Sequence, residues 1–334
     1  MVIEAGESIL PKYLYHVITS PELQNKMKLI AESRSGTFPQ ITFDSIAHLE
    51  LMVPPKPEQL AVSSLLDAIE GHIRNNQKMN QTLEDIAKAI FKSWFVDFDP
   101  VRAKAEGRPT GLPPEISDLF PDAFVDSEIG EIPKGWEVTN VGEITSKGTL
   151  KVRKFSEEVK VLSAVSSGQL RLSEDYFTKQ VFSKNIDNYY VVPRFSFAYN
   201  PSRINIGSIG LNLFDFSGAV SPVYSVFTVR EGMHWFFQEW LNLSSTKGLI
   251  ASLCSGSVRQ SLKHADMESI LLVPPPTSVN TKFNEIYELF MESIRIRNQE
   301  TQILSELRDT LLPKLISGEL RIPDAEKFLE EAGI

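Results

Sequence analysis

The amino-acid sequence predicts an α+β protein in which a globular domain followed by a long helix occurs twice. The first observation is an apolar seam with helical spacing that begins after Pro55. The second is a copy of this seam about 220 residues further along the chain. The third is a set of short β-type runs between the two seams, separated by Gly, Pro, Asn and Ser. Such segregation of helices from strands along the chain is typical of the α+β class.

Residues 58–95 read as the first long helix. Its seam positions recur at alternating spacings of four and three residues, which is the pattern of a helix that packs along another long helix. The seam residues are Val62, Leu66, Ile69, Ile73, Asn76, Asn80, Leu83, Ala87, Ile90 and Trp94. The seam is polar at its middle, at Asn76 and Asn80, where a pair that fixes the register of two helices would lie.

An internal repeat explains the second seam. Adding 220 to positions 30–55 pairs these identical residues without a gap: Ile30/Ile250, Ala31/Ala251, Ser35/Ser255, Gly36/Gly256, Gln40/Gln260, Leu51/Leu271, Val53/Val273, Pro54/Pro274 and Pro55/Pro275. One further residue of offset aligns the long helices, so that Asn76 and Asn80 correspond to Arg297 and Thr301. We therefore predict that a second long helix, residues 280–315, is the partner of the first, with these polar residues meeting near its midpoint.

The elements before the second domain follow in order. Residues 12–30 read as a helix with a start or break at Ser20-Pro21, and residues 46–53 read as a strand that ends at two prolines. After the first long helix, residues 99–133 are rich in Pro, Gly and acidic residues. We expect this connector to dock on the protein through Leu119, Phe120 and Phe124.

The second globular domain opens at Ile132-Pro133-Lys134-Gly135-Trp136. Its β-type runs are residues 160–165, 188–199, 204–213 and 223–229. A helix at 233–245 and a Ser-Gly-Ser turn come next, and a strand at 270–273 ends at three prolines. The second long helix then closes the repeat.

The net charge of −9 argues against a nucleic-acid partner only until it is divided by segment. Residues 133–276 carry 15 basic and 12 acidic side chains, which gives +3. Residues 97–132 carry 3 basic and 9 acidic side chains, which gives a net charge of −6. The complete globular domain is therefore the basic part of an acidic chain, as a local DNA-binding surface requires.

Several classes of protein do not fit the sequence. The single Cys254 excludes a disulfide framework and fits a reducing cytoplasm. The first residues lack the basic start and apolar core of a signal peptide, and no apolar run approaches the roughly 20 residues that span a bilayer. The five His residues are scattered without metal-ligand spacing, so we expect neither a metal nor a cofactor.

Catalytic motifs are also missing. Asn200-Pro201-Ser202-Arg203 only superficially resembles the Asn/Asp-Pro-Pro-aromatic element of adenine methyltransferases, and no Gly-rich strand-turn-helix motif accompanies it. The sequence has neither a phosphate-binding loop for ATP nor the carboxylate spacing of a metal-dependent nuclease. We therefore do not expect the chain to be an enzyme.

Three stretches resemble the specificity subunits of type I restriction-modification systems. They are IPKGWEV at 132–138, QTLEDIAKAIFKSWFVDFDPVRAK at 81–104 and LSELRDTLLPKLISGELRI at 304–322, together with the PPKPEQ and LVPPP junctions before the two long helices. The resemblance covers nearly the whole chain. It implies target-recognition domains joined by two long helices that pair as an antiparallel coiled coil with pseudo-twofold symmetry.

The resemblance also implies a function and partners. Such a subunit reads a split site in double-stranded DNA and directs adenine methylation and restriction to it. Its helices act as a spacer and as the dock for two modification (methyltransferase) subunits, to which restriction subunits add. The implied division is a partial recognition domain at 1–55, a long helix at 56–98, a connector at 99–131, a complete recognition domain at 132–276, a second long helix at 277–317 and a tail at 318–334.

The first domain departs from this pattern. With the offset of 220, Met1 corresponds to Ser221, so residues 133–220 have no counterpart in the first copy. We expect a chain truncated at its amino terminus, for which self-association is an open possibility. The alternative function is a scaffold or decoy that binds modification subunits without reading DNA.

Candidate DNA-binding residues lie in four loops of the complete domain. A basic cluster suited to phosphate contacts follows the first strand region. The alternative interpretation is a solvated basic loop that contacts no DNA. The other three loops carry amides, hydroxyls and cations that suit base edges, although each also reads as a structural turn. The candidates are Lys147, Lys151, Arg153 and Lys154; Ser166 and Gln169; Asn200 and Arg203; and Ser257, Arg259, Gln260 and Lys263. Arg259 and Lys263 are favoured for readout because the first copy has Pro39 and Phe43 in their places.

Overall fold

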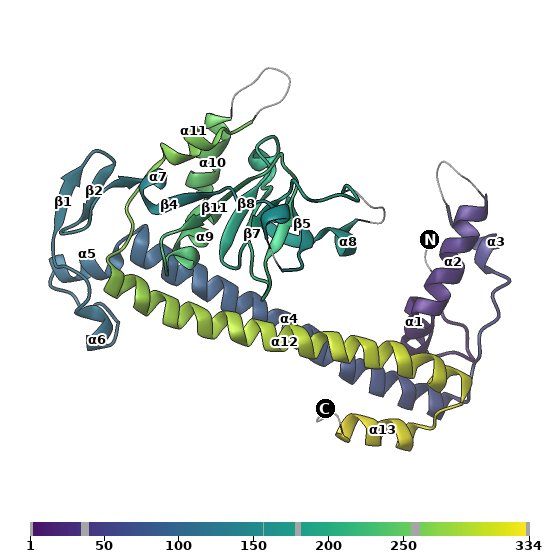
Figure 1. Ribbon diagram of the computed structural model, residues 1–334. Coiled ribbons are helices and arrows are strands. Elements are labelled where there is room, and N and C mark those ends of the chain that lie inside the picture. Colours follow the sequence, from purple (N-terminus) through teal and green to yellow (C-terminus); the bar gives the residue numbers. More distant parts are fainter. Residues whose placement is uncertain (1–2, 35–39, 156, 178–181, 255–260, 332–334) are drawn as a thin grey trace. The chain divides into compact units, whose positions relative to one another are not determined.

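The computed structural model describes residues 3–34, 40–155, 157–177, 182–254 and 261–331 (Figure 1). The chain forms two compact units. Unit 1 consists of Met1–Asp85 and Phe290–Ile334, and unit 2 consists of Ile86–Leu289. The described part of unit 1 is helical, whereas unit 2 combines helices with short strands, so the α+β class is confirmed.

Two long helices contribute to both units. Helix α4 is Lys56–Phe95 and helix α12 is Thr277–Ser317, close to the predicted 58–95 and 280–315. Each begins directly after prolines, Pro54 and Pro55 before α4 and Pro276 before α12, and a further proline, Pro57, is accommodated in the first turn of α4. Both lengths and both starts therefore follow from the sequence.

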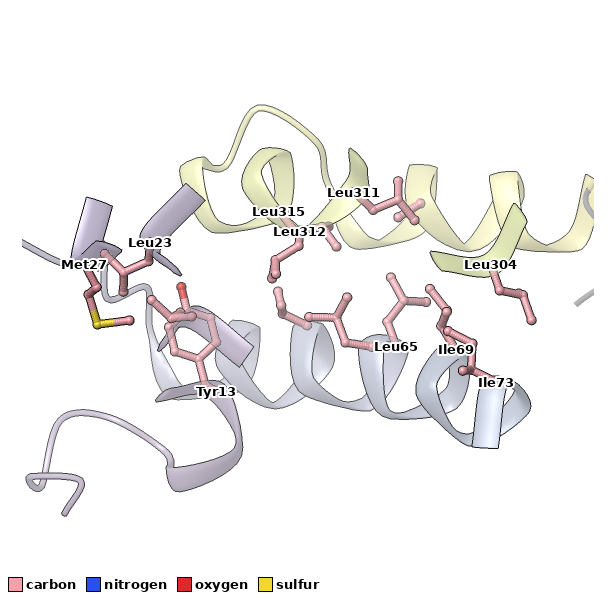
Figure 2. Packing of buried hydrophobic residues seen from close by; sticks show 14 residues of the cluster. Tyr13, Leu23, Met27, Leu65, Ile69, Ile73, Leu304, Leu311, Leu312 and Leu315 are labelled. Atoms are coloured by element: carbon pink, nitrogen blue, oxygen red, sulfur yellow. The ribbon is translucent and has the colours of Figure 1, made fainter. Parts of the chain in front are cut away.

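The helices are antiparallel in unit 1, where the first half of α4 packs on the last half of α12 (Figure 2). Residues near the start of α4 pack against residues near the end of α12, as the resemblance implied. The buried side chains of this cluster are Tyr13, Val17, Leu23, Met27, Val62, Leu65, Leu66, Ile69, Ile73, Leu304, Leu311, Leu312, Leu315 and Ala325. Most of the α4 members are seam residues, so the seam forms the core of unit 1 as predicted.

The polar middle of the seam has a different partner from the predicted one. The Asn80 side-chain amide donates to Oδ1 of Asn298 at 2.9 Å. Arg297, predicted to meet this position, instead donates to the Ser293 carbonyl oxygen of its own helix at 3.0 Å. The contact falls on the neighbouring residue of α12 because antiparallel packing fixes which side of the second helix faces Asn80.

Three short helices precede α4 in unit 1, and a further one follows α12. They are α1 (Pro11–Thr19), α2 (Pro21–Arg34), α3 (Phe43–Ile46) and α13 (Ile322–Glu331). The predicted break at Ser20-Pro21 is confirmed. Ser20 Oγ accepts a hydrogen bond from the Leu23 backbone N–H at 3.3 Å, which caps α2, and proline is well tolerated in the first turn of a helix.

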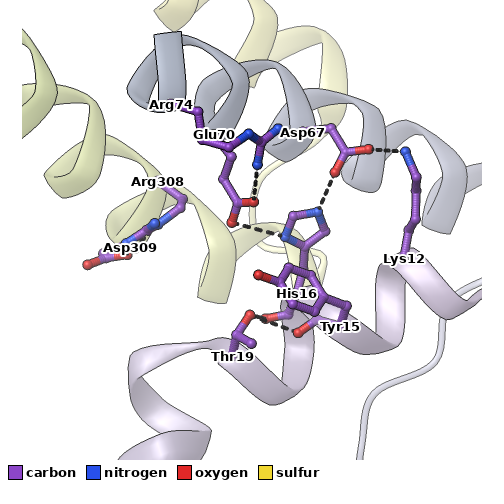
Figure 3. Close-up of polar contacts among 9 residues, drawn as sticks. All are labelled: Lys12, Tyr15, His16, Thr19, Asp67, Glu70, Arg74, Arg308 and Asp309. Carbon is purple, nitrogen blue, oxygen red and sulfur yellow. Dashed lines mark hydrogen bonds and ion pairs between the residues drawn. The ribbon is translucent and has the colours of Figure 1, made fainter. Parts of the chain in front are cut away.

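A polar cluster fastens α1 to α4 (Figure 3). The buried His16 ring lies between two carboxylates of α4, with Nε2 3.0 Å from Asp67 Oδ1 and Nδ1 3.7 Å from Glu70 Oε1. Lys12 donates to the same Asp67, and this hydrogen bond holds the pKa of the Asp67 carboxyl below its ordinary value. Asp67 thus links two residues of α1 to one position of α4.

Aromatic side chains join the helices in unit 2. The ring of Phe283 in α12 lies 5.0 Å from that of Phe95 and 5.9 Å from that of Phe91, both in α4. Trp94 lies 5.2 Å from Phe120, which is buried. The connector therefore docks through Phe120, as predicted. It contains α5 (Asp99–Ala105), α6 (Pro114–Ser117) and a hairpin of β1 (Phe124–Ser127) and β2 (Gly130–Pro133).

Two four-stranded sheets form the β part of unit 2. The first has the order β6-β5-β10-β7, with β5 (Lys160–Val165), β6 (Gln169–Leu172), β7 (Tyr190–Val192) and β10 (Gly218–Val220). The second has the order β4-β11-β8-β9, with β4 (Thr145–Gly148), β8 (Ser196–Tyr199), β9 (Ile209–Leu211) and β11 (Ser225–Val229). A separate pair joins β3 (Thr139–Asn140) to β12 (Leu271–Leu272).

Short helices lie around these sheets. They are α7 (Val141–Ile144), α8 (Ser173–Tyr176), α9 (His234–Asn242), α10 (Ser244–Leu253), α11 (His264–Glu268) and the 3-10 turns Val152–Lys154 and Ile204–Ile206. In α9, Phe237 packs its ring against Phe197 of β8 at 5.2 Å and Phe227 of β11 at 5.7 Å. This helix therefore covers one face of the second sheet.

The predicted strands are confirmed with three corrections. The run 160–165 coincides with β5, whereas 188–199 is split into β7 and β8 and 204–213 begins as a 3-10 turn. The split falls at Pro193-Arg194-Phe195, where Phe195 has a left-handed backbone with φ of 60°. Residues 46–53 are not a strand, because a strand needs a neighbour: β12 in unit 2 has β3, and the described part of unit 1 offers no such strand.

The internal repeat is confirmed, and α4 and α12 begin 221 residues apart, which is the offset predicted for the long helices. The short helices before them do not keep the single offset of 220 predicted for positions 30–55. The break at Ser20 between α1 and α2 corresponds to the break at Leu243 between α9 and α10, an offset of 223. The helix caps Thr42 and Lys263 give 221 for α3 and α11, and this offset continues through α4 and α12. The structure thus repeats an order of three short helices followed by one long helix.

Candidate nucleic-acid interface

Three loops of unit 2 meet beside the two sheets. They are the β5–β6 turn with the first residue of β6 (166–169), the β8–β9 loop (200–208) and residues 261–263 in front of α11. The hydroxyl of Ser208 donates to the Ala164 carbonyl oxygen at 2.8 Å, and the Leu262 backbone N–H donates to the Pro201 carbonyl oxygen at 3.1 Å. We call these three loops the loop cluster.

Two glycines allow the loops of this cluster to approach closely. A Cβ on Gly207 would lie 2.5 Å from the Ser166 carbonyl oxygen, and Gly207 also has a left-handed backbone with φ of 89°. A Cβ on Gly210 would lie 2.6 Å from backbone atoms of Gln169 and Leu170. Any larger residue would push the β8–β9 loop away from the β5–β6 turn. The sequence Gly-x-x-Gly at 207–210 therefore sets the spacing of the cluster.

The loop cluster brings together five of the predicted site residues. Arg203 and Lys263 are exposed cations, Ser166 and Gln169 are exposed polar groups, and Asn200 is half-buried. Asn200 Oδ1 accepts a hydrogen bond from the Ser202 backbone N–H at 3.1 Å, so this amide oxygen stabilises the turn itself. Gln169 Oε1 accepts from Arg171 Nε at 3.1 Å. The oxygens of these two amides are thus engaged within the protein, whereas the exposed cations Arg203 and Lys263 carry donors only.

Lys147 lies next to the cluster. It is exposed on β4 and stands opposite Phe227 of β11, whose ring lies 6.2 Å from that of His264 in α11. Burial lowers the pKa of His264, and the positive charge of Lys147 lowers it further. Lys147 is therefore close to α11, and Lys263 directly precedes that helix.

The remaining basic residues, Lys151, Arg153 and Lys154, form a separate group. Lys151 forms an isolated antiparallel β-bridge with Tyr190 of β7, the edge strand of the first sheet. Its Nζ lies 5.2 Å from the centre of the Tyr190 ring. Gln169 lies on β6, at the opposite edge. Four strand spacings separate the two positions, which is about 19 Å. Arg153 and Lys154 are exposed in the 3-10 turn that follows.

Three predicted residues, Ser257, Arg259 and Gln260, lie outside the described residues. Lys263 is the described member of that group. It is the cap residue in front of α11, and its backbone carbonyl accepts from the Met267 backbone N–H at 3.2 Å. The backbone of Lys263 thus starts a helix while its side chain is exposed.

Sequence reasoning missed the residues that form a cleft beside the loop cluster. The cleft has a volume of about 250 Å3 and is lined by the β5–β6 turn, the β8–β9 loop, α9 and α10. Its polar lining residues include Asn205, Gln238, Asn242 and Lys247. Gln238, Asn242 and Lys247 read as ordinary surface positions of two helices, and only the packing of α9 and α10 against the loops brings them to this place.

Two classes of feature are missing from the described residues. They contain no group of three or more His, Cys, Asp or Glu side chains that could hold a metal ion. In the part of the chain that the structure covers, no helix is long and apolar enough to cross a membrane.

Comparison with known proteins gives consistent matches. A family model described as the type I restriction modification DNA specificity domain matches residues 1–85. The type I restriction enzyme HindI specificity subunit of Haemophilus influenzae is 29% identical over 368 residues, which cover 96% of this chain and 80% of the relative. The MjaIX specificity subunit of Methanocaldococcus jannaschii is 24% identical, with 95% of this chain and 71% of the relative covered.

Solved structures with similarity to the chain include two single subunits. The S subunit of a type I restriction-modification system from M. genitalium has a TM-score of 0.49 at 16% identity, covering 92% of this chain and 73% of that one. The HsdS subunit from Thermoanaerobacter tengcongensis has a TM-score of 0.34 at 13% identity, covering 94% of this chain and 72% of that one.

Proposed function

Because this chain belongs to the family of type I restriction-modification specificity subunits, we propose that it recognises the DNA target sequence for such a complex. The observation that carries this proposal is the extent of the similarity. It covers 96% of the chain, and therefore both long helices and the complete globular domain of unit 2, rather than one motif. In this role the chain is not an enzyme, and other subunits of the complex carry the catalytic sites.

The loop cluster is the proposed reading surface. Arg203 and Lys263 are exposed, and each is held by a backbone that the structure fixes: Arg203 O accepts from the Ile206 and Ser208 backbone N–H groups, and Lys263 caps α11. A guanidinium or ammonium group suits the acceptors of guanine in the major groove. Gln169 adds an amide group suited to adenine. Backbone rigidity matters here because readout needs side chains at fixed positions on the base edges.

The second basic group is proposed to contact the DNA backbone. Lys151 lies about 19 Å from Gln169 across the first sheet, which is wider than the major groove of about 12 Å, and Arg153 and Lys154 follow Lys151 in the chain. Cations at this distance suit the phosphates that flank a groove rather than the bases inside it. They would position the duplex and make binding dependent on salt concentration.

We further propose that the target site is split and that the modified base is adenine. The internal repeat supports a split site, because short helices followed by a long helix occur twice and each copy offers a place for one recognition domain. The long helices would act as the spacer and as the dock for two modification subunits, to which restriction subunits add. The single Cys254 fits a complex that works in the reducing cytoplasm.

The alternative is a scaffold or decoy that binds modification subunits but reads no sequence. The test is to co-purify the chain with its modification subunits and to map methylated adenines across the genome of the expressing cell. A discrete bipartite motif supports the proposal. A palindromic motif would mean that two copies assemble and read through one domain each, and complex formation without any motif would favour the decoy.

A further inference from the structure

The cleft beside the loop cluster adjoins the proposed reading surface but has a shape that paired bases do not fit. It has a volume of about 250 Å3, and Ser166, Ile206 and Gly207 of the loop cluster line it. Base pairs present their edges inside a groove, where protruding side chains reach them. A hollow in the protein surface can only take a group that itself protrudes from the duplex. Two groups meet this condition, a phosphate and a base that has left the stack.

The floor of the cleft favours a base over a phosphate. It contains Ile204, Leu241 and Ile250, which are all buried. A phosphate binds where several donors or cations converge, whereas Lys247 is the only cation among the described residues that line the cleft. A base that has left the stack is held between apolar or aromatic side chains. The apolar floor therefore suits the face of a base, and Lys247 suits the phosphate of the same nucleotide.

Two amides line the cleft beside this floor. Gln238 and Asn242 are four residues apart on α9 and thus lie on one side of that helix. Neither side chain makes a hydrogen bond to another residue in the part of the chain that the structure describes. An amide both donates and accepts, as the pairing edge of a base requires. The volume lies below the roughly 300 Å3 at which pockets for drug-sized molecules begin, so one base is the largest group that suits it.

The proposed function generates a base of this kind at the target. Methyltransferases act on a base only after turning it out of the duplex. An adenine that enters the catalytic site of a modification subunit therefore leaves the thymine opposite it without a pairing partner. Thymine also carries a methyl group, which makes favourable contacts with apolar side chains.

We propose that the cleft holds this unpaired thymine while the modification subunit acts on the adenine. Ile204, Leu241 and Ile250 receive the ring with its methyl group, Gln238 and Asn242 bond to the pairing edge, and Lys247 contacts the phosphate. The inference rests on the proposed function, because it requires adenine as the modified base. It gives the specificity subunit a second role besides reading, which is to keep the opened base pair from closing.

The test compares two duplexes with the assembled complex. Both carry the target found by mapping methylated adenines, and one of them lacks only the base opposite the methylated adenine. Asn242→Trp places a large ring at the cleft. Ser252→Trp is the matched control, because Ser252 is an exposed residue of α10 that does not line the cleft.

We expect Asn242→Trp to weaken equilibrium binding of the intact target about tenfold and to change binding of the duplex without that thymine by less than about twofold. Ser252→Trp should leave both unchanged. Equal weakening on both duplexes would overturn the proposal. If the unchanged complex showed no preference for the target over unrelated DNA, the proposed function itself would fail, and the role of the cleft with it.

A second measurement uses the unchanged chain and so does not depend on how a variant folds. 4-Thiothymine replaces the thymine opposite the methylated adenine, and irradiation of the complex cross-links it to the residues that it touches. We expect the cross-links in residues 204–210 or 238–250, and none in these segments when 4-thiothymine stands elsewhere in the target. Cross-links only to other parts of the chain or to the modification subunit, or no cross-link at all, would also overturn the proposal.

Discussion

Gln59 and Asn280 occupy the same place in the two copies of the repeat and make the same kind of contact. Each is a buried amide in the first turn of a long helix, at an offset of 221. Gln59 Nε2 donates to the Ser8 carbonyl oxygen at 2.9 Å, and Asn280 Nδ2 donates to the Gly232 carbonyl oxygen at 2.9 Å. Both acceptors lie just before the first short helix of their copy of the repeat, α1 and α9. The amide thus ties the segment before that helix to the long helix of the same copy.

Replacing either amide by Leu should destabilise its own unit. Gln59→Leu removes the donor of the Ser8 carbonyl oxygen and the acceptor of the Leu10 backbone N–H. Asn280→Leu removes one of the two side-chain amides that donate to the Gly232 carbonyl oxygen, the other being that of Asn284, so its effect should be the smaller one. Losing a hydrogen-bond partner in a buried site costs about 1–3 kcal/mol. Hydrogen exchange should therefore become faster in α1 for Gln59→Leu and in α9 for Asn280→Leu. Gln81→Ala on the exposed side of α4 is the control, and exchange that accelerates equally in both units would contradict the assignment.

The contact between Lys12 and Asp67 should make unit 1 sensitive to acid. The hydrogen bond from Lys12 lowers the pKa of the Asp67 carboxyl in the folded protein below its ordinary value of 3.8. A carboxyl with a lowered pKa contributes stability above its unfolded pKa, and this contribution is lost as the pH falls through its folded pKa. Lys12→Met should therefore lower the urea midpoint at pH 6.

The difference between Lys12→Met and the original chain should then shrink below a pH of about 4 and vanish when Asp67 is protonated. Lys26→Met is the control, because Lys26 forms an exposed pair with Glu22 and such pairs contribute little. A difference that stays constant down to the lowest pH would mean that Lys12 acts through packing of its aliphatic part and not through its charge.

Arg203→Ala and Lys154→Ala should affect DNA binding in different ways. Arg203 is in the proposed reading surface, so its loss should relax specificity at one position of the target and cost about 1–3 kcal/mol there. Lys154 is proposed to contact phosphate, so its loss should weaken binding to all sequences and reduce the salt slope by about 1. The measurement is equilibrium binding by the assembled complex to target and non-target duplexes at several salt concentrations. Equal effects on all sequences from both changes would refute this division of roles.

Much of the fold was predictable because the helices carry a strong periodic signal. The seam from Val62 to Trp94 gives both the length of α4 and, through the repeat, the length of α12. The prediction of a strand at 46–53 was wrong, because an apolar run before two prolines has the same sequence pattern whether or not a neighbouring strand is present to pair with it. The offset of 221 predicted for the long helices is confirmed. The single offset of 220 before them came from identities counted without a gap, whereas the boundaries of the short helices give 223 and then 221.

The candidate site was less predictable. Arg203 and Lys263 are 60 positions apart, and they belong to one loop cluster only because the Leu262 backbone N–H donates to Pro201. Lys151 and Lys154, which are close to Lys147 in sequence, lie at a sheet edge that the strand order places away from Gln169. Charge and amide content selected these loops as candidates, but strand order decides which of them lie close together.

Exchange of residues 132–276, the proposed recognition domain, tests the central claim most directly. Residues 132–276 are replaced by the corresponding domain of a relative with a different target, and methylated adenines are mapped for the assembled complex. The account predicts that one half of the recognised motif changes to the sequence read by the donor domain, while the spacing and the other half stay the same. An unchanged motif would show that residues 132–276 do not read the DNA and would contradict the account.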